Sequence, residues 1–196
     1  MKTLLTALAS VFLITNTAFA QVKWSVDPAH TSARFEVNHL GISFVDGTFN
    51  TLSGVVETTD SVNFNQAKIA FEIDVNSIDT RIDARDQHLK SDDFFNAAQF
   101  PKMTLTNGVL IKGKKGHFIL KGDLTIRDVT KPVVFQVVQN NGIITDPWGK
   151  TRAGFTATTS INRLDYHINY NDKLPNGVQA VASDVKIIVN TELVKN

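Results

Sequence analysis

Residues 118–127 read FILKGDLTIR, and apolar and polar side chains alternate along this stretch. One parity carries Phe118, Leu120, Leu124 and Ile126, and the other carries Lys121, Asp123, Thr125 and Arg127. A period of two predicts a β-strand that buries one face and exposes the other. The sequence Gly113-Lys114-Lys115-Gly116 just before it predicts a turn, because glycine commonly ends strands.

The same alternation recurs along most of the chain. It covers residues 33–39, 67–75, 103–111, 133–137, 155–161 and 185–189. About eight antiparallel strands in one domain favour a sandwich or a closed barrel. No linker or internal repeat divides the sequence, so residues 21–196 are predicted to form one domain. Because the chain has no cysteine, its hydrophobic core alone must hold the fold.

The first twenty residues have the pattern of an export signal. Lys2 gives a basic start, residues 4–14 are mostly apolar, and Ala18-Phe19-Ala20 is an A-x-A cleavage site. The apolar run is too short to cross a bilayer, which takes about twenty residues. We therefore expect cleavage after Ala20 and export of a mature chain that begins at Gln21.

Charge and histidine spacing exclude two classes of partner. The chain has 20 basic and 19 acidic residues, whereas nucleic-acid binding needs positive charge gathered on one face. Its five histidines show neither H-x-H nor H-E-x-x-H spacing. The sequence thus predicts no nucleic-acid partner, no metal site and no cofactor.

Residues 80–95 break the strand pattern. Asp86 precedes Lys90 by four residues, and the apolar spacing around them predicts a helix over residues 81–90. On such a helix Asp86 and His88 point to opposite sides, which argues against an acid–base pair within the stretch RDQHLKS (85–91). Ser91, followed by two aspartates, is typical of the N-cap of a further helical turn.

Six blocks of sequence resemble the motifs of the YceI-like family, in the family's order. They read VDPAHTSARFEVNHLG (26–41), GTFNTLSG (47–54), SIDTRIDARDQHLKSDDFFN (77–96), FPKMTL (100–105), KGDLTIRDVTKPV (121–133) and AGFTATTSINRLDY (153–166). Two places depart from the family pattern. Tyr166-His167 stands where the family usually has Phe-Gly, and Arg127-Asp128 stands where a glycine is common.

The resemblance implies an all-β protein of the periplasmic polyisoprenoid-binding class. Its fold would be an eight-stranded antiparallel lipocalin-like barrel, with one or two short helices between strands and a long apolar chain inside. The residues expected to contact that chain are Phe35, Val37, His39, Phe71, His88, Phe94, Phe95, Met103, Phe135 and Phe155. Phe94 and Phe95 would act as a lid, Arg85 and Asp86 would fix the helix, and His88 or Lys90 would meet a polar head group.

Three functions remain open at this level. The leading one is non-enzymatic binding or carriage of a long-chain lipid, with a polyisoprenoid as the first candidate. An enzyme acting on a prenyl or acyl lipid would need a polar cluster in the cavity, for which His39, Asp86 and His88 are the candidates. A barrel filled by its own side chains would instead be a structural or stress-response protein without ligand. A homodimer formed by pairing of strand edges is a further expectation for such a barrel.

Overall fold

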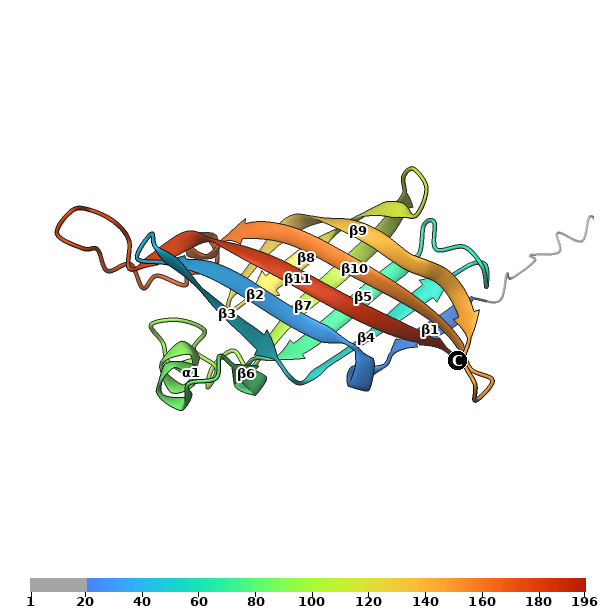
Figure 1. The fold of residues 1–196 in the computed structure, drawn as a ribbon, viewed down its shortest axis with the longest axis horizontal. Coiled ribbons are helices and arrows are strands. Elements are labelled where there is room, and N and C mark those ends of the chain that lie inside the picture. The colour runs from blue at the N-terminus through green and yellow to red at the C-terminus, as the bar shows by residue number, and fades with distance from the viewer. Residues whose placement is uncertain (1–20) are drawn as a thin grey trace, which may run out of the picture.

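The computed structural model describes residues 21–196, and in it a single antiparallel sheet closes on itself to form a barrel (Figure 1). Its strand segments are β1 (Val22–Val26), β2 (Ser32–His39), β3 (Ser43–Phe49), β4 (Leu52–Thr58), β5 (Lys68–Asp74), β6 (Ile78–Asp79), β7 (Lys102–Lys112), β8 (His117–Ile126), β9 (Val129–Thr145), β10 (Thr151–Asn162) and β11 (Val181–Lys195). The helical segments are α1 (Asp83–Lys90) and the 3₁₀ turns η1 (Pro28–His30), η2 (Val75–Ser77) and η3 (Arg163–Tyr166). The predicted signal peptide lies outside the described residues.

The eleven strand segments make eight barrel strands, because three of the eight are interrupted. β1 and β2 continue each other across η1, and both pair with β11. β3 and β4 in turn pair with β2 and β1, and β6 and β5 pair with β3 and β4. The pairing of β1 with β11 closes the ring. The prediction of an eight-stranded antiparallel barrel is therefore confirmed.

Two of the interruptions have the same local cause. Asp27 precedes η1 and accepts a hydrogen bond from the amide of Ala29 at 3.0 Å, and Asp74 precedes η2 and accepts one from the amide of Asn76 at 2.9 Å. A short aspartate side chain offers the backbone an alternative to the strand ladder. Pro28 adds to this at η1, because it has no amide hydrogen to donate.

The period-two pattern sorts side chains as expected. In β8 Phe118, Leu120, Leu124 and Ile126, which share one parity, are buried inside the barrel, while Ile119 and Lys121 on the opposite parity are exposed. The turn at residues 113–116 is also present, and Gly116 takes a positive φ of 76° there. The core of the protein is thus the inner face of the barrel.

The one α-helix of residues 21–196 begins two residues later than predicted, and the prediction of a second helical turn was wrong. Ser91 ends α1, because its hydroxyl donates to the carbonyl of His88 at 2.7 Å. The chain then folds into turns in which the amide of Asn96 donates to the carbonyl of Ser91 at 2.7 Å. Asn96 has a positive φ of 47°, which stops a helix at this point. Within residues 21–196, no helix is long and apolar enough to cross a membrane.

Candidate ligand-binding cavity

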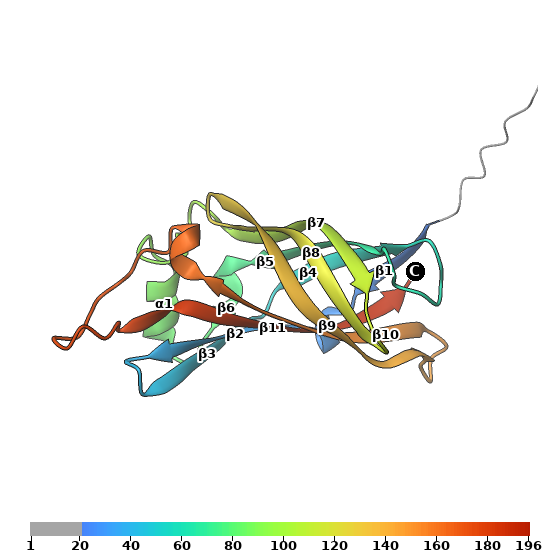
Figure 2. The ribbon, with the colours of Figure 1, turned by 90° about the horizontal axis from the view of Figure 1, so that it is seen from above.

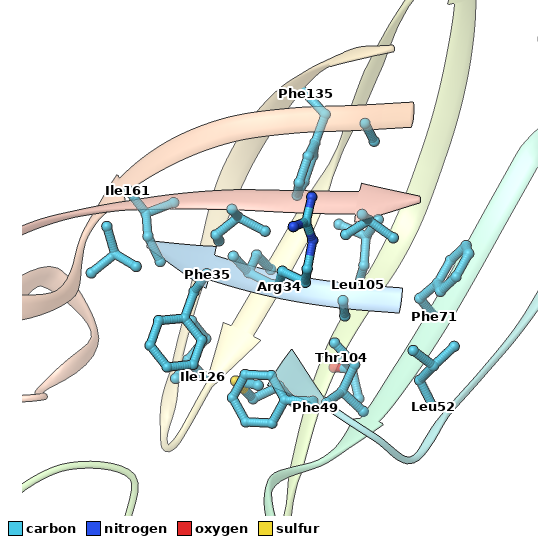
Figure 3. Close-up of a pocket in the computed structure, with 18 of the residues that line it drawn as sticks. Arg34, Phe35, Phe49, Leu52, Phe71, Thr104, Leu105, Ile126, Phe135 and Ile161 are labelled. Atoms are coloured by element: carbon cyan, nitrogen blue, oxygen red, sulfur yellow. The ribbon is translucent and has the colours of Figure 1, made fainter. Parts of the chain in front are cut away.

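A cavity of about 210 Å³ lies inside the barrel. Figure 3 shows side chains from several strands around it, among them Phe35, Phe49, Phe71 and Phe135. Almost no polar atom faces this space. Apolar protein cavities of roughly 150 Å³ stay dry and accept apolar guests such as benzene. The cavity is therefore suited to an apolar ligand, and it presents few polar groups to whatever lies inside it.

One end of the barrel is sealed by four aromatic rings, which we call the floor: Trp24, Phe64, Phe118 and Phe155. Phe64 comes from the loop between β4 and β5 and lies between Trp24, with ring centroids 5.0 Å apart, and Phe155, at 4.8 Å. Trp24 and Phe64 are fully buried. The Trp24 indole nitrogen donates to the Thr58 hydroxyl at 3.4 Å, so the floor buries no unpaired indole donor.

The middle of the cavity wall contains a row of small side chains. Ala33 on β2 lies opposite Val189 on β11, Val189 lies opposite Ala157 on β10, and Ala157 lies opposite Val137 on β9. All four line the cavity. This small-residue row crosses four neighbouring strands, and because its side chains are short it leaves free volume that larger residues would fill.

The opposite end is covered by α1 and residues 91–100, which we call the cover. Leu89, Phe94 and Phe95 of the cover line the cavity. Phe95 packs edge-to-face on Phe49, with centroids 5.8 Å apart. Phe35 extends the same aromatic group, and its ring lies across Gly47, where a Cβ would come within 2.5 Å of the Phe35 ring. Any larger residue at position 47 would displace Phe35 from the cavity wall.

Buried polar contacts fix the start of α1. The Asp86 carboxylate accepts from the amide of Thr80 at 2.9 Å and from its hydroxyl at 2.5 Å. Arg85 donates to the hydroxyl and to the carbonyl of the same Thr80, both at 2.7 Å. Thr80 is almost completely buried. Arg85 and Asp86 thus anchor the helix to Thr80, the residue that follows β6, which is a structural task.

Arg127 ties the cover to the rest of the barrel. Its Nη1 donates to the carbonyls of Asp92 at 3.1 Å, Phe94 at 2.8 Å and His167 at 2.7 Å. His167 in turn contacts Asp128, with Nδ1 3.0 Å from a carboxylate oxygen. The two departures from the family pattern therefore meet in one place. His167 has a positive φ of 57°, a conformation that glycine adopts without strain.

Eight of the ten residues expected to contact a ligand line the cavity. They are Phe35, Val37, Phe71, Phe94, Phe95, Met103, Phe135 and Phe155. His39 and His88 are not among the lining residues. His88 lies on the outside of the cover, with Nε2 2.9 Å from an Asp93 carboxylate oxygen and its ring edge-on to Phe94 at 5.1 Å.

The polar residues considered for an enzyme are not gathered in the cavity. Asp86 is engaged by Thr80, His88 contacts Asp93, and His39 lies near the end of β2 opposite Ser43. None of these three side chains lines the cavity.

Several cavity-lining residues were not predicted from the sequence, and Phe49 shows the reason most clearly. Phe49 ends β3 in the stretch GTFNTLSG, where glycine and polar residues hide the alternation. Arg163 was also missed as a lining residue. It is 3% exposed, and its nitrogens donate to the carbonyls of Ile168, Val181 and Ala182 at 2.7–2.9 Å. Burial lowers the pKa of Arg163 from its usual value. It serves to hold β11 to the segment after η3.

A group of charged side chains lies at the floor end of the barrel, near the turn between β9 and β10. Ligand atoms of Asp27, His30 and Glu192 lie within 4.8 Å of one another. The Arg152 guanidinium bonds to Asp27 and Glu192 and, at 2.6 Å, to Asp146. Hydrogen bonds from His30 and then from Arg152 lower the pKa of Asp27 to about 2. Arg152 supplies the positive charge that a metal ion would otherwise bring, so this group is an ion-pair network.

Fold and cavity together define a class of protein: a closed eight-stranded antiparallel barrel with an apolar internal pocket. The sequence profile of the YceI-like domain matches residues 24–193, and the chain belongs to the YceI-like family. A UPF0312 protein of Shewanella denitrificans is 37% identical over 169 residues, which cover 85% of this chain and 87% of that protein. A UPF0312 protein of Vibrio vulnificus is 39% identical over 140 residues, or 71% and 73% of the two chains.

Solved structures share the fold at lower identity. BcnA of Burkholderia cenocepacia matches with a TM-score of 0.71 at 20% identity, over 85% of this chain and 98% of that one. The YCEI protein of Campylobacter jejuni matches at 0.64 and 24% identity, over 96% and 99%. A polyisoprenoid binding domain from Saccharophagus degradans matches at 0.61 and 16% identity, over 88% and 98%. At these identities the likeness establishes the barrel and leaves the ligand to be argued from the cavity.

Proposed function

We propose that this protein binds and carries a long-chain apolar lipid of the polyisoprenoid class, without catalysis, after export to the periplasm. The observation that carries the proposal is the internal cavity of about 210 Å³, which almost no polar atom faces. The polyisoprenoid binding domain of Saccharophagus degradans, with the same fold, supports the ligand class. The signal-like pattern of residues 1–20 supports export.

The energetics favour an apolar chain in this space. Each isoprene unit has five carbons, so burying one contributes on the order of 3–4 kcal/mol at about 0.8 kcal/mol per carbon. Ordering of the chain and the loss of its free motion offset part of this gain. A few units inside the barrel therefore suffice for micromolar binding.

On this proposal the chain lies between the floor and the cover, against the eight predicted residues that line the cavity. Because the wall is apolar, a polar head group stays outside, at the cover end. His88 then affects the bound chain only indirectly, through its contact with the ring of Phe94. His39, at the end of β2, is available to a head group only from outside the cavity.

The direct test is native mass spectrometry of protein purified without detergent, followed by lipid extraction. We expect added mass on the protein and an isoprenoid in the extract. Protein stripped of lipid is then offered a polyprenol and a straight-chain alcohol of equal carbon number, and we expect the polyprenol to bind more tightly. A bare protein that takes up neither lipid would point to the ligand-free structural role. Turnover of an added lipid would point to the enzyme.

A further inference from the structure

The cover end of the barrel carries two unusually exposed apolar side chains. Ile42 is 85% exposed and Phe44 is 64% exposed, both at the tip of the hairpin between β2 and β3. Both views of the ribbon show this hairpin and the loop before β11 projecting from the barrel at the end where α1 lies (Figures 1 and 2). Two neighbouring apolar side chains presented in this way form a candidate interaction surface.

The hairpin tip lies beside segments that line the cavity. The amide of Leu40 donates to the carbonyl of Ala180 at 3.0 Å, and the next residue, Val181, lines the cavity. Val37, five residues before Ile42 on the same hairpin, also lines it. A surface on which Ile42 rests therefore lies next to the cover end of the cavity.

Exposure alone does not select this end. Trp148 is 80% exposed and Val62 is 74% exposed at the floor end, in the turn between β9 and β10 and the loop between β4 and β5. There, however, Trp24 and Phe64 seal the barrel. A partner that exchanges apolar material with the cavity must approach from the cover end.

We propose that the β2–β3 hairpin tip docks the protein on a lipid bilayer, with Ile42 and Phe44 inserted among the lipids and the cover facing the membrane. An apolar chain then passes between bilayer and cavity without crossing water. This rests on the proposed function. The exposed area of the two side chains is on the order of 300 Å², well below the roughly 800 Å² per partner of a stable protein interface. A bilayer, in contrast, needs only a shallow apolar anchor for reversible binding.

Charge has little part in the docking. Beside the tip, Asp46 pairs with Arg81 at 2.8 Å, and further along β2 Glu36 lies 3.9 Å from Lys186. Because these charges are balanced locally, we expect binding to neutral phosphatidylcholine vesicles that added salt does not weaken.

The experiment compares two matched double variants of the mature protein. Ile42→Asp with Phe44→Asp removes the apolar tip, and Val62→Asp with Trp148→Asp removes the pair of similar exposure at the floor end. Each protein is sedimented with phosphatidylcholine vesicles, and transfer of a fluorescent polyene lipid from vesicle to protein is followed. We expect the hairpin variant to lose sedimentation and to transfer lipid at least tenfold more slowly, while the floor variant behaves as wild type.

Two controls separate this proposal from the proposed function. The same lipid delivered from ethanol should bind the hairpin variant as it binds wild type, because the cavity is unchanged. If no protein takes up lipid from ethanol, the proposed function fails, while sedimentation with lipid vesicles still decides the docking. If the hairpin variant sediments with vesicles and transfers lipid at the wild-type level, the docking proposal is overturned. Loss of sedimentation and transfer in the floor variant would overturn it as well. A dimer that the hairpin variant converts to monomer, with transfer unchanged, would assign the tip to a second copy of this chain.

Discussion

Replacing Ala157 by leucine is expected to stabilise the ligand-free protein and to weaken its binding of lipid. Ala157 lies in the small-residue row, opposite Val137 and Val189, and lines the cavity. Leucine adds three carbons, which contribute up to about 2.4 kcal/mol when they are buried at about 0.8 kcal/mol each. Ordering the leucine side chain removes about 0.5–1 kcal/mol. We expect a net gain of about 1–2 kcal/mol.

The same substitution at Ala153 provides the control. Ala153 lies on the same strand and the same face, but it is buried against the core and is not a cavity-lining residue. Three extra carbons there overpack the core and cost about 1–3 kcal/mol. The same substitution is thus expected to raise the free energy of unfolding at position 157 and to lower it at position 153.

Urea unfolding of lipid-stripped protein measures both effects, and added lipid then reports on binding. At a lipid concentration one hundred times its dissociation constant, wild type gains about 2.7 kcal/mol. If Ala157→Leu binds tenfold more weakly, it gains only about 1.4 kcal/mol at the same concentration. Equal destabilisation by Ala153→Leu and Ala157→Leu, with lipid binding as in wild type, would refute the view that the cavity is an open binding site.

Three further predictions follow from the cover and from the ion-pair network. Arg127→Ala removes the donor to three carbonyls, so bound lipid should dissociate faster than from wild type, with Arg127→Lys intermediate. An unchanged dissociation rate would show that the contacts of Arg127 with the cover do not control lipid release. His88→Ala should leave the amount and length of bound lipid unchanged and lower the thermal midpoint slightly; loss of a catalytic turnover with folding intact would show that the protein is an enzyme. Asp27 has its pKa lowered to about 2 from 3.8, so its contribution to stability is present above pH 3.8 and is lost as the pH falls through 2. Thermal midpoints of wild type and Asp27→Asn should therefore differ at pH 5 and converge toward pH 2, and a constant difference would contradict the lowered pKa.

The barrel was predictable from the sequence because antiparallel strands with one buried face carry their signature locally. Phe118 and its neighbours alternate at a period of two, and seven such segments could be recognised. The eighth strand, made of β3 and β4, was not recognised, because glycine and short polar residues such as Thr48 obscure its parity. The role of Ser91 was misjudged because a serine followed by aspartates looks the same whether it ends one helix or begins another.

The candidate site was predictable in part. Parity placed Phe35, Phe71 and Phe135 on the inner face, and all three line the cavity. His39 shares the inner parity but lies toward the end of β2, beyond the last lining residue of that strand. His88 was assigned from the motif around it, and only the fold shows that its partner is Asp93 on the outer side of the cover.

Whether the barrel is hollow depends on how side-chain volume is distributed along its axis, which no local pattern reveals. Large rings gather at the two ends, with Trp24 and Phe64 in the floor and Phe94 in the cover. Between them, the small-residue row brings alanine and valine side by side from strands that are far apart in the sequence. An eight-stranded barrel has room inside for either a packed core or one small ligand. Here the short side chains in the middle leave that room open, and because almost no polar atom faces it, the space is suited to an apolar guest rather than to water.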